Sequence, residues 1–249
     1  MNKNSNTYQI LYSAVMVILV GAALAFIYMA LKPKQDENVA NDKRKQILGA
    51  IHVAPQDDSQ VEATFNKYIT GSFLVDTCGN ELADTTVKAF DIDMKNNVKS
   101  EQRRLPVFKA TLDDGSTKYI VPVYGAGLWG PIWGYVAVDD NGTGIYGAYF
   151  SHEGETPGLG AEIATPKFQQ QFSGKQILKD GEFKSVGVLK QGQVPLHGED
   201  YVNAISGGTI TSQGVQKMLE DCMTPYAPFF KRLQGAKPAA CTSECAPAV

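Results

Sequence analysis

Basic residues are in short supply in this chain of 249 residues. It has 23 lysines and arginines against 26 aspartates and glutamates, so its formal net charge is −3. Proteins that bind nucleic acids usually carry a basic surplus, and its absence argues against a nucleic-acid partner. The sequence also lacks an internal repeat and a strand-associated dinucleotide fingerprint, so we expect no dinucleotide-binding site, and hence none for a nicotinamide dinucleotide, in this chain.

Metal-ligating side chains are equally scarce. The three histidines have no ligand-like spacing, and the four cysteines lack the paired close spacing of a structural zinc or iron–sulfur site. We therefore assign no metal site. The residues concerned are His52, His152, His197, Cys78, Cys222, Cys241 and Cys245.

The cysteines fall into different settings. Cys222 lies on the apolar face of a predicted helix, where a thiol is most simply part of the core. Cys241 and Cys245 lie in an Ala- and Pro-rich end of the chain, a composition typical of a disordered tail. In an oxidising compartment these two could bridge to each other.

One long apolar run is present near the N-terminus. Residues 10–31 contain no charged side chain over about 22 positions, enough to cross a bilayer as a helix. A cleavable signal peptide is the alternative, but the run continues past the small residues Ala23 and Ala25 and is too long for a typical signal core. We expect an uncleaved transmembrane helix, and one without the ionisable groups of an ion relay.

Basic residues next to this span are unevenly distributed. Lys3 precedes it, and a cluster follows it that comprises Lys32, Lys34, Lys43, Arg44 and Lys45. The positive-inside rule would place the large domain in the cytoplasm, although the rule is weakest for long domains.

Periodicity predicts an α+β domain built on an antiparallel sheet. Apolar spacing favours helices at 41–51 and 59–69, and a short helix after Pro166 that carries Phe168 and Phe172. A further strand is predicted at 185–189. Two turn dipeptides, Asp114-Gly115 and Asn141-Gly142, predict hairpins that join 107–112 to 119–123 and 134–138 to 145–150.

The most informative segment is the turn at 202–212, which combines hydroxyls with two adjacent glycines, Gly207 and Gly208. Glycines let a ligand approach the main chain closely. An amphipathic helix over 213–223 follows, with Val215, Met218, Leu219 and Cys222 on its apolar side. Because a helix N-terminus attracts anions, a phosphate fits at this turn, among the hydroxyls of Ser206, Thr209, Thr211 and Ser212. An ordinary capped turn is the plainer interpretation.

Two upstream segments have the composition of ligand-binding loops. In Ser151–Gly160, one proline and two late glycines make a rigid loop that can present Thr156 and Leu159 to a planar ligand. In Tyr124–Pro131, Trp129 is flanked by small residues, as a stacking surface for an aromatic ring requires, although burial in the core is the commoner fate of tryptophan.

The three segments, in this order, resemble those of the NqrC family, the C subunits of the Na+-translocating NADH:quinone oxidoreductases. The turn resembles the flavinylation motif, in which a flavin transferase joins FMN through its phosphate to the last Thr, here Thr209. The sequence departs from the motif at Asn203, where the family usually has Asp, and at Gly208, where it usually has Ala. The related G subunit of the Rnf complex shares the anchor and the motif, but the longer region between them here favours the NqrC family.

The resemblance implies a domain organisation and a location. We expect a short cytoplasmic N-terminus (1–9), a transmembrane helix (10–31), a juxtamembrane and helical lead-in region (32–104), an FMN-binding domain (105–233) and a disordered tail (234–249). The resemblance places the domain on the outer, periplasmic face of the bacterial inner membrane, against the charge rule.

The function implied is electron relay through covalent FMN, with other membrane subunits as partners and a flavin transferase acting during maturation. No residue is expected to be catalytic. The alternatives are an Rnf-type subunit, a non-redox FMN-binding or sensing module, and a self-contained flavin reductase with Glu155 as an acid. The expected cofactor-binding residues are Thr209, Ser206, Gly207, Gly208, Thr211, Glu155, Thr156, Leu159, Gly160, Leu128 and Trp129.

Overall fold

A computed structural model describes residues 5–82, 87–100, 103–195 and 198–235. The chain divides into two units, one ending at Lys43 and one beginning at Arg44. Cys241 and Cys245, with the bridge and the tail predicted for them, lie outside the described residues, as does His197. Cys78 is disulfide-bonded, and Cys222 is a free, buried thiol.

The first unit consists of most of helix α1 (Asn6–Ala50), which contains an apolar stretch of mean hydropathy 2.6 in which no residue is buried. This helix includes the predicted span, and it continues without a break to Ala50, so the helix that we expect at 41–51 is not a separate element. Pro33 lies inside α1, where its ring removes one backbone hydrogen bond. Length and composition make α1 a candidate membrane anchor.

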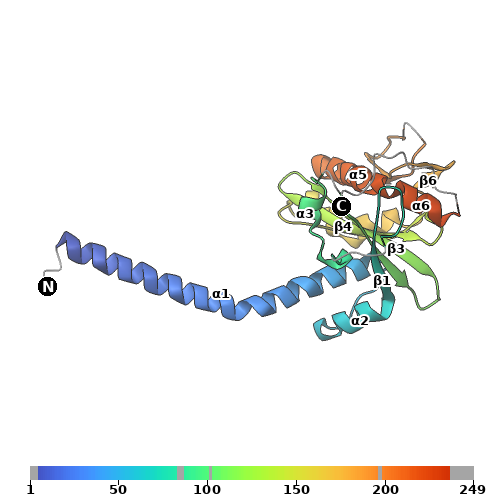
Figure 1. Cartoon of the computed structure of the whole chain (residues 1–249). Coiled ribbons are helices and arrows are strands. Elements are labelled where there is room, and N and C mark those ends of the chain that lie inside the picture. The colour runs from blue at the N-terminus through green and yellow to red at the C-terminus, as the bar shows by residue number, and fades with distance from the viewer. Residues whose placement is uncertain (1–4, 83–86, 101–102, 196–197, 236–249) are drawn as a thin grey trace. The chain divides into compact units, whose positions relative to one another are not determined.

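The second unit is built on a five-stranded antiparallel sheet in the order β1-β2-β3-β4-β5 (Figure 1). Both predicted hairpins are present, the first between β2 and β3 and the second between β4 and β5. The strands are β1 (Ile69–Val75), β2 (Leu105–Thr111), β3 (Thr117–Ala126), β4 (Pro131–Asp139) and β5 (Ile145–His152).

Strand β1 did not emerge from the sequence. The sequence predicts a helix over 59–69, whereas helix α2 (Val61–Tyr68) ends one residue earlier and Ile69 is the first residue of β1. The expected boundary between residues 104 and 105 separates β1 from β2, yet hydrogen bonds pair these strands. The compact unit that begins at Arg44 therefore extends further toward the N-terminus than the expected domain of 105–233.

The two faces of the sheet carry separate cores because side chains alternate along each strand. Val121 and Val123 face the helices that follow the sheet, while Ile120 faces the last turns of α1. On that second face, the Trp133 indole N–H donates to Gln46 Oε1 at 3.0 Å.

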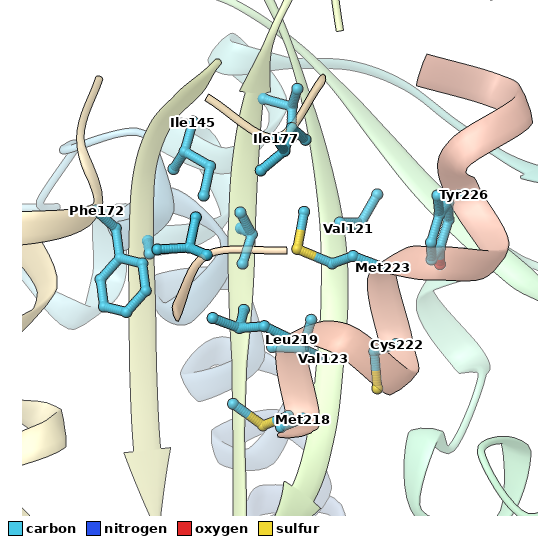
Figure 2. Packing of buried hydrophobic residues seen from close by; sticks show 14 of the residues in the cluster. Val121, Val123, Ile145, Phe172, Ile177, Met218, Leu219, Cys222, Met223 and Tyr226 are labelled. Atoms are coloured by element: carbon cyan, nitrogen blue, oxygen red, sulfur yellow. The ribbon is translucent and has the colours of Figure 1, made fainter. Parts of the chain in front are cut away.

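Helix α5 (Thr209–Met223) covers the first face together with α6 (Ala227–Leu233) (Figure 1). The predicted apolar stripe is buried in full, and Figure 2 shows Leu219 and Met223 pointing from α5 toward the strand that carries Val121 and Val123. Phe168 and Phe172 also enter this core, from α4 (Pro166–Gln169) and the 3₁₀ turn Gln170–Phe172.

Short elements complete the unit. The predicted strand at 185–189 is β8 (Gly187–Leu189), which pairs in parallel with β9 (Tyr201–Asn203). Strand β9 is followed by the turn before α5. The remaining helices and strands are α3 (Met94–Asn97), β6 (Leu178–Lys179), β7 (Glu182–Phe183), and 3₁₀ turns at Asp58–Gln60, Ala89–Asp91, Gly160–Ala164 and Thr224–Tyr226.

The packing of α5 can be tested by truncating Leu219, which has no exposed surface. Leu219→Ala should lower the free energy of unfolding of the full chain in detergent by about 2 to 5 kcal/mol, because it leaves a cavity against the sheet. Glu220→Ala, at the next and exposed position, should change it by less than about 0.5 kcal/mol. Equal effects in denaturant titrations of the two variants would contradict the packing described.

Candidate functional site

A pocket of about 200 Å³ lies where three segments meet: the turn between β3 and β4, the loop after β5, and the start of α5. Every residue expected at the cofactor site lines it except Ser206, which is exposed in the adjoining turn. Ile210 also lines it and was not foreseen. The lining residues are Leu128, Trp129, Glu155, Thr156, Leu159, Gly160, Gly207, Gly208, Thr209, Ile210 and Thr211.

Helix α5 begins at Thr209, four residues before the start at residue 213 that the sequence predicts. Two hydrogen bonds fix the turn that precedes the helix. Gly208 N–H donates to the Ile205 carbonyl at 3.1 Å, and Ile205 N–H donates to Ser212 Oγ at 3.0 Å. Thr209 is therefore the first helical residue, next to backbone N–H groups that have no partner within the helix.

This position favours an anion. The helix dipole concentrates partial positive charge at its N-terminus, and Thr209 is half-buried there. Gly207 has a φ of +76°, a conformation that side chains other than glycine rarely adopt, and a Cβ there would approach Leu159 Cδ2 to 2.6 Å. The turn can therefore bring its main chain against the loop after β5 because Gly207 lacks a side chain.

Apolar side chains surround the pocket and remain exposed. Trp129 is 69% exposed and Ile210 is 54% exposed, and Leu128 and Leu159 are exposed as well. Trp129 is thus not part of the core, which is the commoner place for this residue. Exposed apolar groups at the mouth of a pocket suit a planar ligand that is bound through one face.

Glu155 is a buried charged residue of the pocket lining, with only 5% of its surface exposed. Its Oε1 accepts the Trp129 backbone N–H at 2.8 Å, and its Oε2 accepts the Thr211 hydroxyl at 2.6 Å. Its own N–H donates to His152 Nδ1 at 3.2 Å. The carboxylate therefore joins all three segments of the pocket.

Cys222 is not among the residues that line the pocket. Its thiol donates to the Tyr124 carbonyl at 3.3 Å, and burial raises its pKa. A thiol with a raised pKa stays protonated at neutral pH and is a poor nucleophile. This agrees with the structural role inferred from the sequence.

The profile of the FMN-binding domain family matches residues 127–224, a range that contains every residue lining the pocket. A solved structure, the C subunit of the Na(+)-translocating NADH-quinone reductase from Parabacteroides distasonis, is 46% identical with a TM-score of 0.74, over 80% of this chain and 96% of that one. The crystal structure of NqrC from Shewanella oneidensis is 28% identical with a TM-score of 0.63, over 79% of this chain and 98% of that one.

Curated relatives agree with the structural matches. The C subunit of the Na(+)-translocating NADH-quinone reductase from Vibrio anguillarum is 31% identical over 82% of this chain and 83% of its own length. The same subunit from Neisseria meningitidis serogroup B is 31% identical over 88% of this chain and 89% of its own length. The chain belongs to the NqrC family, the C subunits of the Na(+)-translocating NADH-quinone reductases.

Proposed function

We propose that this chain is a membrane-anchored flavoprotein subunit that relays electrons through FMN bonded to Thr209, within a complex that reduces quinone with NADH and transports sodium. The observation that carries the proposal is the pocket itself. It combines a hydroxyl at a helix N-terminus with exposed apolar side chains on two other segments. The names of the relatives favour this interpretation over an Rnf-type subunit.

The residues present fit the two chemically different ends of FMN. The start of α5, at Thr209, would hold the phosphate, because unpaired N–H groups and the helix dipole favour an anion there. Trp129, Leu128 and Leu159 would contact the flat ring, since they are apolar and exposed beside the same pocket. Bound FMN supplies the redox chemistry, in one- or two-electron steps.

The size of the pocket explains why a covalent bond would be useful. At about 200 Å³ it is smaller than the roughly 300 to 1,000 Å³ of pockets that enclose a whole cofactor-sized ligand. Much of the cofactor would therefore be open to solvent and free to dissociate. A bond to Thr209 makes rebinding intramolecular and keeps the cofactor at the pocket at any dilution.

Attachment would require a separate flavin transferase. A threonine hydroxyl needs a base to attack a phosphoanhydride. Glu155 is the only carboxylate among the lining residues, and both of its oxygens already accept hydrogen bonds. The turn is open to another protein, because Ser206, Gly207 and Asn203 are all exposed.

The outer face of the membrane is the side we propose for the domain. The disulfide at Cys78 supports this location, because disulfides persist in oxidising compartments and are rare in the cytosol. The lysines and arginine after the span argue for the other side, but long domains translocate largely regardless of charge.

The attachment site is tested by peptide mass spectrometry of the chain made with and without a co-expressed flavin transferase. The FMN adduct should appear only with the transferase and map to Thr209, and Thr209→Ala should abolish it because no other hydroxyl occupies the first position of α5. Thr224→Ala, just after the other end of α5, should keep the adduct. An adduct on Ser206 or Thr211 would exclude this assignment.

The ring contacts are tested with Leu159→Ala and Thr156→Ala in the flavinylated chain. Covalent flavin should survive both changes, because the bond is made elsewhere, while the visible spectrum or the midpoint potential shifts as contacts are lost. A net hydrogen bond contributes about 0.5 to 1.5 kcal/mol, so the effect of Thr156→Ala should be modest. Unchanged spectra, potentials and electron-transfer rates in both variants would remove this loop from the site.

Orientation is tested by placing a cysteine at Val194, which is 75% exposed. A maleimide that cannot cross the membrane should label Val194→Cys in intact spheroplasts above the level of the unmodified chain. This follows because an outer-face residue meets the reagent directly. Labelling that requires membrane disruption would place the domain in the cytoplasm.

A further inference from the structure

The carboxylate of Glu155 uses each of its oxygens for a different segment. One accepts the backbone N–H of Trp129, and the other accepts the hydroxyl of Thr211, which is itself only 1% exposed. Thr211 is the third residue of α5, two positions after Thr209. A single side chain thus links the loop that carries Trp129 to the helix turn that carries Thr209.

Two glycines make room for this link. A Cβ at Gly127 would clash with Glu155 Oε1, and a Cβ at Gly160 would clash with Glu155 Oε2 and lie 2.5 Å from Thr211 Oγ1. Neither glycine has a positive φ, so backbone conformation does not account for its presence. The presence of glycine at both positions is explained by the space that the Glu155 carboxylate needs.

The Trp129 loop has few other constraints of this kind. Its turn is closed by the Gly127 N–H bond to the Gly130 carbonyl at 2.8 Å, which fixes its local shape but not its position over the pocket. The Trp129 ring is mostly exposed, so side-chain packing holds it weakly. The bond from its N–H to Glu155 ties the tip of this loop to the loop after β5, and through Glu155 to α5.

We propose that Glu155 and Thr211 are positioning residues that hold Trp129 at a fixed position relative to Thr209, rather than direct ligands of the flavin. This rests on the proposed function, in which Trp129 contacts the ring and Thr209 carries the phosphate. The pair keeps the two contact points at a fixed separation before the cofactor arrives, so attachment at Thr209 places the ring against Trp129. Loss of the Thr211 hydroxyl leaves Glu155 Oε2 buried without a donor, so the carboxylate turns away and releases the Trp129 N–H.

The test is amide hydrogen exchange of the full chain in detergent, made without the transferase so that no flavin contributes. Thr211→Val, which keeps the shape and removes the hydroxyl, should speed exchange at the Trp129 amide by about tenfold, while Thr211→Ser restores protection. Thr224→Val is the matched control, because it removes a hydroxyl that donates only to Glu220 O in the last turn of the same helix. It should leave the Trp129 amide unchanged. Gly160→Ala should also speed exchange at the Trp129 amide, because its Cβ would displace the Glu155 carboxylate.

The flavinylated chain supplies the second readout. Thr211→Val should retain the covalent FMN mass while flavin fluorescence rises, because Trp129 no longer quenches it, and Thr211→Ser should restore the wild-type signal. Unchanged exchange at Trp129 in both Thr211→Val and Gly160→Ala would overturn the proposal, as would failure of Thr211→Ser to restore it. Absence of an FMN adduct from the wild-type chain would instead overturn the proposed function, and the exchange data would still decide the role of Glu155.

Discussion

A buried carboxylate with both oxygens bonded is the interaction on which the pocket depends. Burying the charge of Glu155 is costly unless strong donors compensate, and here the donors are a backbone N–H and a threonine hydroxyl from two other segments. Removing either donor leaves an unpaired buried oxygen, so each of the two bonds matters to the three segments that they link. Gly127 and Gly160 follow from the same constraint, since a side chain at either position would displace the carboxylate.

The sheet explains how segments so far apart in sequence reach this carboxylate. Antiparallel pairing of Ala126 with Pro131, and of Ile132 with His152, places the β3–β4 turn and the end of β5 at the same end of the sheet. Helix α5 reaches that end too, because Gly214 approaches the Ala126 carbonyl closely enough to exclude any side chain. Parallel pairing of β8 with β9 then fixes where the chain enters the turn before Thr209.

Much of this arrangement could be predicted from the sequence, because the signals were local. The two hairpins, the buried stripe of α5 and nearly all of the pocket residues were evident from turn dipeptides, periodicity and short motifs. The sequence does not reveal strand β1, because its pairing with β2 spans about 30 residues of intervening chain. Nor does it single out Ile210 within the turn at 202–212, because the prediction of phosphate binding there rests on hydroxyls and glycines and not on apolar side chains. The hydrogen-bond partners of Glu155 could not be predicted from the sequence either, because no spacing rule connects residues 129, 155 and 211.

The central claim is that Thr209 and the apolar side chains around this pocket hold one FMN. A crystal structure of the protein produced with its flavin transferase tests it most directly. Electron density should run continuously from Thr209 Oγ1 through a phosphate at the start of α5 to a ring against Trp129, Leu128 and Leu159. Density for the flavin attached elsewhere, or a ring directed away from all three side chains, would contradict it.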